Sequence, residues 1–540
     1  MNRSYTRHLV PAHAPQSAPC RDDQVQNGTG GYVFALDAWA RLDRFLVLGC
    51  EGGTYYASER TLTEDNARGV LECLALDGRR TIERIAEISA SGRAPKNDPA
   101  IFALALAASL SDAPLKAAAF EAMPRVCRTA THLFQFVRDV RAFRSWGRGL
   151  RRAIGRWYTA MSSERLALQV AKYGQRVGYA HRDLLRLAHP KAPSPAHDAI
   201  FRWATGGGSS ALDRPSKHGA AIERSALPSL LDAFEAVRAA KTSSEVVSLV
   251  RRHRLTHEMV PSEWKDDVRV WAALVEEMPL TALIRNLGKM TAVGLLRPLA
   301  ESTRKVATRL RSKPLLRSAR VHPLSVLAAL KVYAQGHGER GKLRWEPVRE
   351  IYDALEDAFY AAFALVKPTN VRHLLALDVS GSMTCGEIAG MPGMNPRVAS
   401  AAMAMATART EPHHHFVGFS HEIVSLDISP RSTLEATIHA IERVPMGATD
   451  CALPMLYAKA NKLPVDVFIV YTDNETWFGA VHPFQALRDY RDATGIPAKL
   501  VVVGLTATEF SIADPNDAGM LDVVGFDAAA PALIADLAAA

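Results

Sequence analysis

Apolar residues recur at spacings of three and four along most of the first two thirds of the chain. The pattern extends from about Trp39 to Ala364, in segments such as FALALAASLSDAPLKAAAFEAMPRVC, RLALQVAKYGQRVGYA and PLSVLAALKVYAQ. It predicts amphipathic helices separated by prolines such as Pro114, Pro124 and Pro190, and alternation at a spacing of two is nearly absent. Helices continuing over such a length favour a solenoid of HEAT-like repeats. No sequence repeat is evident, so an irregular all-helical domain is an open alternative.

Two stretches interrupt this pattern. Residues 191–220 contain GGGSS and RPSKHGAA, and we expect a long flexible surface loop there. Residues 336–347, GHGERGKLRWEP, form a second connection before one more predicted helix, REIYDALEDAFYAAFALV.

Short apolar runs alternate with helical segments after residue 368. The runs are HLLALDVS, HHFVGFS, DVFIVYTD, KLVVVGL and LDVVGF, and the helical segments are RVASAAMAMATAR, LEATIHAIERV, LPMLYAKAN and HPFQALRDYRDAT. This alternation predicts a doubly wound, mostly parallel sheet covered by helices on both faces. The expected fold class is therefore multidomain, with an α-helical domain at residues 1–368 and an α/β domain at residues 369–540.

The charge of the chain differs between these two domains. From Thr369 onward there are 10 Lys and Arg residues against 19 Asp and Glu residues, whereas the first 368 residues hold 55 basic and 37 acidic residues. The net charges are −9 and +18, which sum to the +9 of the whole chain. A strongly basic domain attracts polyanions, so we expect RNA or DNA as its partner, with a solvated basic surface as the alternative.

The remaining composition favours a cytoplasmic protein without a membrane segment. No apolar stretch reaches about eighteen residues, and the first residues, MNRSYTRHLVPAHAPQSAP, lack the apolar core of a secretory signal. The six cysteines are scattered without a CxxC pair, which indicates free thiols in a reducing compartment.

A cluster of oxygen-bearing side chains is predicted at the carboxyl edge of the α/β sheet. Asp378, Ser380 and Ser382 form a D-x-S-x-S motif directly after an apolar run. Asp473 ends the run DVFIVYTD, and Thr449 lies in the loop before another helix. Ligands of open parallel sheets collect at this edge. Two carboxylates and three hydroxyls suit a hard divalent cation, with Mg²⁺ the best fit because few protein ligands leave room for water.

Other motifs are weaker, and none indicates an enzyme. His413–His415 lead into an apolar run and would point to alternating faces, which disfavours a metal site. Asp450 is better explained as a helix cap than as a ligand. Residues 336–342 superficially match a phosphate-binding loop, but Leu343 stands where Ser or Thr is needed and no apolar strand precedes it.

Basic and aromatic residues cluster in the segment KYGQRVGYAHRDLLRLAHP. Lys172 and Arg176 are four residues apart and would share one face if the segment were helical, and His189 follows the next short helix. Tyr173 and Tyr179 lie among them. Upstream, RSWGRGLRRAIGRWY contributes four arginines near two tryptophans: Arg148, Arg151, Arg152, Arg156, Trp146 and Trp157. Phosphate-neutralising charge beside aromatic rings suits RNA. The alternative is a solvated helix face with its aromatic residues in the core.

The chain resembles the Ro autoantigen (TROVE-domain) family, in its bacterial type, along nearly its whole length. The likeness rests on long ordered segments, among them RLDRFLVLGCEGGTYY, HRDLLRLAHP, EMPLTALIRNLGKMTA, VHPLSVLAALKVYAQGHGERGKLRW, DVSGSM, GATDCALPM and DVFIVYTDNET. The resemblance implies a closed ring of HEAT repeats joined to a von Willebrand factor A domain with a metal-ion-dependent adhesion site. The Gly- and Ser-rich stretch near 191–218 matches no motif of the family.

Function and site residues are also implied by this resemblance. Such proteins bind small non-coding Y RNAs on the outer ring surface, accept single-stranded 3′ ends of misfolded RNAs in the central hole, and act in RNA quality control or decay. Bacterial relatives can be tethered by Y RNA to the exoribonuclease polynucleotide phosphorylase. The family's RNA-binding residues fall on Lys172, Arg176 and His189. Its metal ligands fall on the five side chains of the D-x-S-x-S cluster already described.

We expect the protein to be a monomer. The main competing hypothesis is a protein-binding A domain on a helical scaffold, which uses its metal to bind an acidic partner and has no role with RNA. The +18 charge of the helical domain argues against it. Nucleic-acid absorbance of the purified protein that high salt removes would distinguish the two.

Overall fold

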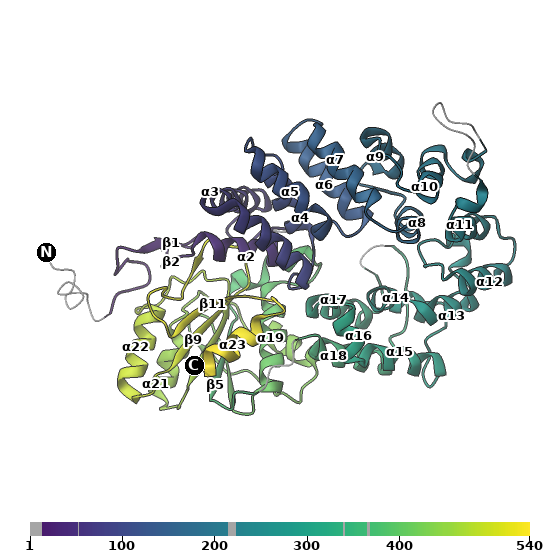
Figure 1. The fold of residues 1–540 in the computed structure, drawn as a ribbon. Helices are drawn as coiled ribbons and strands as arrows, with labels where there is room; N and C mark the ends of the chain where they lie inside the picture. The colour runs from purple at the N-terminus through teal and green to yellow at the C-terminus, as the bar shows by residue number, and fades with distance from the viewer. Residues whose placement is uncertain (1–12, 52, 214–222, 339–340, 364–367, 540) are drawn as a thin grey trace.

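The structure, a computed structural model, describes residues 13–51, 53–213, 223–338, 341–363 and 368–539. It confirms a helical domain followed by an α/β domain (Figure 1). The helices of the first domain are α2 (Ala38–Leu48), α3 (Glu59–Ser91), α4 (Asp98–Ala107), α5 (Ala113–Val126), α6 (Ala130–Phe143), α7 (Arg148–Thr159), α8 (Ser163–Lys172), α9 (His181–Ala188), α10 (Pro195–Gly206), α11 (Ser229–Ala239), α12 (Ser243–His253), α13 (Val268–Glu277), α14 (Leu280–Ala292), α15 (Glu301–Arg311), α16 (Lys313–Ser318), α17 (Pro323–Ala334) and α18 (Arg349–Ala362). Among the described residues, no helix has the length and apolar character needed to cross a bilayer.

Local sequence signals explain where most of these helices begin. The side chains of Ser58, Asp112, Thr129 and Ser162 each accept a hydrogen bond from a backbone N–H of the first helical turn. Pro124, which the spacing pattern places between two helices, instead lies in the last turn of α5.

The helices pack in two layers that curve into a ring. Helices α3, α5, α7 and α9 contact one another in succession, while α4 packs against α6 in the second layer. Figure 1 shows α5, α7 and α9 on the side away from α14 and α17. The chain segment after α3 meets the segment before α17: the Arg320 guanidinium donates to the Ala90 carbonyl, and His322 Nε2 lies 2.9 Å from the Arg93 carbonyl oxygen. These contacts close the ring.

A six-stranded sheet forms the centre of the α/β domain, in the order β11 (Met520–Val524), β9 (Lys499–Gly504), β8 (Val467–Thr472), β5 (His373–Asp378), β6 (His414–Phe419) and β7 (Ile423–Val424). All pairings are parallel except that of β6 with β7. The surrounding helices are α19 (Pro396–Thr410), α20 (Leu434–Glu442), α21 (Leu453–Ala460), α22 (Pro483–Thr494) and α23 (Ala530–Ala539).

Alternate residues of the strands enter two separate cores. Leu375 and Leu377 of β5 pack with α19, α20 and α23, in a core continuous with that of the helical domain. Leu374 and Ala376 pack with α21 and α22 on the other face. Both faces are buried, as a doubly wound sheet requires.

The N-terminal segment joins the α/β domain instead of the helical ring. Strands β1 (Gln24–Gln26) and β2 (Tyr32–Ala35) pair antiparallel, and β2 also pairs with β10 (Phe510–Ser511). Residues 24–35 therefore lie outside the helical domain in space, although they precede it in sequence. Apolar spacing does not reveal these strands, because each has only two to four residues and β2 and β10 are more than 470 residues apart in the chain.

Two local predictions were wrong. Residues 165–180 are not one helix, because α8 ends at Lys172 and a hairpin of β3 (Gln175–Arg176) and β4 (Tyr179–Ala180) follows. Its two-residue turn places Val177 and Gly178 at φ 46° and 83°, the primed geometry that matches strand twist. Helix α10 occupies much of the expected loop at 191–220, and residues 214–222 lie outside the described residues.

The α/β domain contacts both ends of the helical ring. On α2, Arg44 is fully buried; it pairs with Asp522 of β11, and its Nη1 donates to the Phe510 carbonyl at 2.9 Å. On α18, Glu356 accepts from Leu434 N at 3.2 Å and from Arg409 at 3.1 Å. The domain thus bridges the first and last parts of the ring.

Replacing Arg44 by Ala should lower the free energy of unfolding by about 3–5 kcal/mol, because the Asp522 carboxylate loses its buried cationic partner. Chemical denaturation measures this change. The control is Arg68→Ala, which removes an exposed ion pair with Asp65 and should change stability by about 1 kcal/mol or less. Equal losses in the two variants would contradict the role given to Arg44.

Candidate metal centre and nucleic-acid interface

The five predicted ligands lie at the carboxyl edge of the sheet and are all buried. Asp378 ends β5, with Ser380 and Ser382 in the turn that follows, and Asp473 directly follows β8. Thr449 lies in the loop before α21, and its carbonyl accepts hydrogen bonds at 3.1 Å from two backbone N–H groups of the loop after β8. The loops that carry the ligands are thereby tied together.

Hydrogen bonds orient the acidic and hydroxyl groups toward one another. Asp378 Oδ1 accepts from the backbone N–H of Ser380 at 2.9 Å, and its Oδ2 accepts from the Thr472 hydroxyl at 2.7 Å. The Oγ atoms of Ser380 and Ser382 are 3.2 Å apart. Asp473 Oδ1 accepts from the backbone N–H of Glu475 at 3.1 Å.

Burial and repulsion raise the pKa values of the carboxyl groups at this edge. Burial, together with repulsion from Asp473, raises the pKa of Asp378 to about 7. Burial likewise raises the pKa of Asp473, and burial with repulsion from Asp473 raises that of Glu475 to about 8. Among the described residues, the buried Arg397 attracts Asp378 electrostatically, but no Lys or Arg forms an ion pair with any of these three carboxyl groups. A hard divalent cation fits this donor set, because it would add positive charge close to the oxygen ligands.

Two residues near this edge escaped the sequence analysis. Glu475 is buried two positions after Asp473, and its acidic neighbour was the only local signal for it. Tyr56 belongs to the segment before α3, yet it packs beside the acidic loop: a Cβ placed on Gly28 would lie 2.9 Å from both Tyr56 Cβ and Glu475 Oε1. No local pattern could reveal a contact between such distant segments. Asp450 accepts from Ala452 N at 2.9 Å, which agrees with its interpretation as a helix cap.

The three predicted RNA-binding residues lie on successive elements, and Lys172 and Arg176 do not share a helix face. Lys172 ends α8, where its Nζ is 3.2 Å from Glu258 Oε1 and its side chain is 19% exposed. Arg176 lies exposed in the β3–β4 hairpin, and His189 is the exposed residue that ends α9 at φ 46°. The prediction that Lys172 and Arg176 share a helix face is wrong, because α8 ends at Lys172 and Arg176 lies in the hairpin that follows.

Helix α7 presents arginines beside this region. Its Leu150, Ile154 and Trp157 are buried, while Arg148, Arg151, Arg152 and Arg156 are exposed. A Cβ placed on Gly155 would lie 3.6 Å from Pro190, so α7 runs next to the segment that holds His189. Trp157 donates to the Cys127 carbonyl at 2.6 Å inside the core, which excludes it as a stacking surface.

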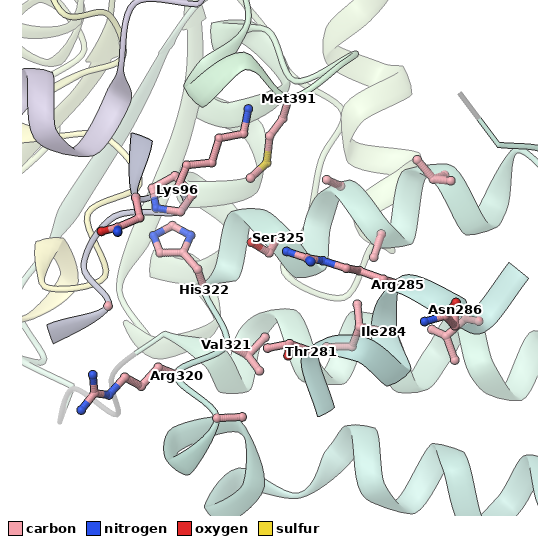
Figure 2. A pocket seen from close by; sticks show the side chains of 18 of the residues that line it. Lys96, Thr281, Ile284, Arg285, Asn286, Arg320, Val321, His322, Ser325 and Met391 are labelled. Carbon is pink, nitrogen blue, oxygen red and sulfur yellow. The ribbon is translucent and has the colours of Figure 1, made fainter. Parts of the chain in front are cut away.

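The ring encloses a cavity of about 1140 Å³. Among the described residues, its charged lining side chains are six basic ones, Lys96, Arg128, Lys265, Arg285, Lys289 and Arg320, and one acidic one, Asp98. Figure 2 shows Lys96, from the segment before α4, and Arg285, from α14, at this cavity. Met391 and Pro392 of the α/β domain complete the wall. The strongly basic character of the helical domain thus extends into its interior.

Aromatic groups also reach the cavity wall. Trp345 is half-buried and stacks on Tyr333 with ring centroids 6.2 Å apart, and its Nε1 donates to the Tyr333 carbonyl at 2.9 Å. Both residues line the cavity. A rigid aromatic ring beside basic side chains is the arrangement on which nucleic-acid bases stack.

The affinity of the metal site for Mg²⁺ should rise with pH. Below a pKa of about 7 the Asp378 carboxyl is protonated, and a cation must displace that proton to bind. We expect an increase of roughly tenfold between pH 6 and pH 8 for release of one proton, measured by isothermal titration calorimetry. Affinity that does not change over this range would contradict the assignment of Asp378 as a ligand.

Comparisons with known proteins agree with this architecture. Residues 25–331 match the TROVE domain model and residues 372–538 match the Ro60 vWA domain model. The chain is 42% identical over 531 residues to the "RNA-binding protein RO60" of Deinococcus radiodurans, covering 98% of each chain. It is 36% identical to the protein of the same name from Caenorhabditis elegans, covering 96% of this chain and 90% of the relative.

A solved structure shows the same arrangement. The crystal structure of the Deinococcus radiodurans RO (RSR) protein superposes with a TM-score of 0.68 at 41% identity, covering 93% of this chain and 99% of that one. The chain therefore belongs to the Ro family, with a TROVE domain followed by a Ro60-type von Willebrand A domain.

Proposed function

We propose that this protein binds RNA in two places: structured small RNAs of the Y RNA class on the outer ring surface, and single-stranded 3′ ends of misfolded RNAs in the cavity. Its role would be RNA quality control or decay as a ribonucleoprotein. The relatives are named for RNA binding and not for a reaction, which supports a binding protein over an enzyme. The observation that carries the proposal is the cavity lining of six basic residues against one acidic residue.

The basic side chains of the cavity differ in how freely they can reach the phosphates of a single strand. Arg285 is exposed, whereas the Lys289 ammonium is held by Asp266 and Lys96 donates to the Gly390 carbonyl at 2.9 Å. Low-dielectric walls focus the field of such groups and raise the local concentration of anions. Bases can stack on Trp345 while phosphates contact the cations.

The outer surface suits a folded RNA. The four exposed arginines of α7 run beside the segment of His189, so a phosphate backbone could contact α7 and the end of α9 together. Arg176 extends from the neighbouring hairpin. Lys172 is held by Glu258 and has to release that carboxylate before it can reach a phosphate. We therefore expect Lys172 to contribute less to RNA binding than Arg176.

We also propose that Asp378, Ser380, Ser382, Thr449 and Asp473 hold a divalent cation, with Mg²⁺ preferred. When bound, the ion would supply a Lewis-acidic position for an acidic group of a partner. The protein would act as a cytoplasmic monomer, tethered through its small RNA to polynucleotide phosphorylase. A metal-dependent adhesion scaffold without RNA is the competing function, and it predicts no salt-sensitive nucleic acid on the purified protein.

Replacing Arg176 and His189 together by Ala should weaken binding of a structured small RNA by about tenfold or more, with a salt dependence shallower by about one phosphate contact. Lys172→Ala should have a smaller effect because of Glu258. Electrophoretic mobility shifts across a salt series measure both. Arg60→Ala, which removes an arginine that is 89% exposed on α3, is the control. If Arg60→Ala lowers the affinity for the RNA as much as the double variant does, the RNA does not bind specifically at the surface of Arg176 and His189.

Charge reversal in the cavity should separate the two RNA sites. Arg285→Glu should weaken binding of an RNA with a single-stranded 3′ extension by on the order of tenfold, because a like charge then faces the phosphates. Binding of a fully structured small RNA should be unchanged. Fluorescence anisotropy with the two RNAs measures the difference. Equal weakening for both RNAs would argue against a separate cavity site.

A further inference from the structure

The Glu258 carboxylate is shared between a residue of the outer RNA surface and a residue of the cavity wall. Its Oε1 lies 3.2 Å from Nζ of Lys172, which ends α8. Its Oε2 lies 3.1 Å from Nδ1 of His257, and His257 lines the cavity. Among the described residues, these are the two basic side chains within ion-pair distance of the carboxylate. One negative charge therefore connects the two proposed RNA sites.

A turn after α12 holds Glu258 and His257 in place. The two residues are neighbours within residues 256–259, where the Met259 N–H donates to the Thr256 carbonyl at 2.9 Å. Leu255, just before the turn, and Met259, at its end, are buried. These buried side chains anchor the turn, and the two side chains between them reach different partners: Glu258 reaches Lys172, while His257 reaches the cavity.

Hydrogen bonds indicate that His257 is neutral in this arrangement. Asn286 of α14 (Figure 2) donates from Nδ2 to the Ala282 carbonyl at 2.8 Å, which sets the orientation of its amide. The same Nδ2 lies 3.4 Å from Nε2 of His257. An amide nitrogen is only a donor, so Nε2 accepts, and the single ring proton is on Nδ1, facing Glu258. The imidazole also packs beside the Trp271 ring, with centroids 6.4 Å apart.

The charges around His257 decide when it becomes protonated. Burial lowers the pKa of His257 below the usual value of a histidine, and the Glu258 carboxylate opposes this effect. Three facing cations lower the pKa further: Lys265, Lys172 and Arg285. Lys265 and Arg285 line the cavity, whereas Lys172 is the cation that a phosphate on the outer surface would neutralise. Neutralising Lys172 would therefore favour the protonated imidazole.

We propose that Glu258 couples the two RNA sites: a phosphate that binds Lys172 releases the carboxylate to His257, which takes up a proton and adds one positive charge to the cavity wall. This inference rests on the two proposed RNA sites. The proton comes from solvent and binds Nε2, and Asn286 accepts its hydrogen bond once the amide turns to present Oδ1. Because histidine titrates at mildly acidic pH, lower pH then strengthens single-strand binding in the cavity more when RNA occupies the outer surface.

The first test measures the protons that the full-length protein takes up when a structured small RNA without a single-stranded end binds to it. Calorimetry at pH 6, in two buffers of different ionisation enthalpy, gives this number. The wild type should take up roughly a few tenths of a proton more than Glu258→Gln or His257→Gln, because pH 6 is close to the ordinary pKa of histidine. Any protonation of His189 in the outer site is common to all three proteins and cancels in the comparison.

Glu263→Gln is the matched control, because Glu263 is an exposed glutamate in the same connection between α12 and α13. This variant should take up as many protons as the wild type. Equal uptake by the wild type and Glu258→Gln would overturn the proposal.

Binding of a short single-stranded RNA gives a second readout. The ratio of its affinity at pH 6 to that at pH 8 should rise about threefold when the structured RNA is already bound, the size expected for one added charge facing a phosphate. Fluorescence anisotropy measures this ratio, in which repulsion between the two RNAs cancels because their phosphodiester charge is the same at both pH values. The rise should vanish in Glu258→Gln. A rise that persists in this variant, or no rise in the wild type, would overturn the coupling.

Failure of the coupling and failure of the proposed function give different results. If neither RNA shows salt-sensitive binding to the wild type, the proposed RNA function is wrong, and the coupling with it. If both RNAs bind but proton uptake is the same in the wild type and Glu258→Gln, only the coupling through Glu258 is wrong.

Discussion

The docking of the α/β domain on the first helices of the ring is the contact on which the rest of the structure depends. Arg44 of α2 is buried against Asp522 of β11, and Arg93 after α3 pairs with Asp527 in the same region. A buried arginine charge is tolerated only when an anionic partner balances it, so these pairs favour one arrangement of the two domains. That arrangement places Met391 and Pro392 in the cavity wall and Tyr56 beside the loop of Glu475.

The two domains differ in the sign of their charge and in where that charge lies. The helical domain exposes positive charge on surfaces open to a polyanion, among them the arginines of α7 outside and Arg285 in the cavity. The α/β domain concentrates negative charge in a small buried volume, where Asp378, Asp473 and Glu475 repel one another. The first arrangement favours a large ligand with many phosphates, and the second favours one small ion. Because the two arrangements suit such different ligands, the proposed RNA and metal sites would not compete for the same partner.

Geometry changes the importance of individual basic residues. Lys172 lies on a helix end against Glu258, whereas Arg176 extends from a hairpin whose turn holds Val177 in the left-handed region. A β-branched residue in that conformation is uncommon and costs free energy, so the surrounding contacts must hold the hairpin in place. The Arg141 guanidinium supplies one such contact, because it donates to the Tyr179 hydroxyl at 2.9 Å. Two basic residues of the same sequence segment can therefore differ in how freely their side chains reach a phosphate.

Sequence alone determined the division into helical and α/β domains, the strands β5, β6, β8, β9 and β11, and the position of Asp378 and Asp473 at one sheet edge. These features follow from hydrophobic spacing and from the rule that parallel strands end on the same side, both of which act over short stretches of chain. Tertiary structure alone decided the ring closure, the basic cavity, the pairing of β2 with β10 and the packing of Gly53 against Gly386. Each of these joins residues that are far apart in the chain, and such contacts depend on how whole elements pack, which no local pattern records.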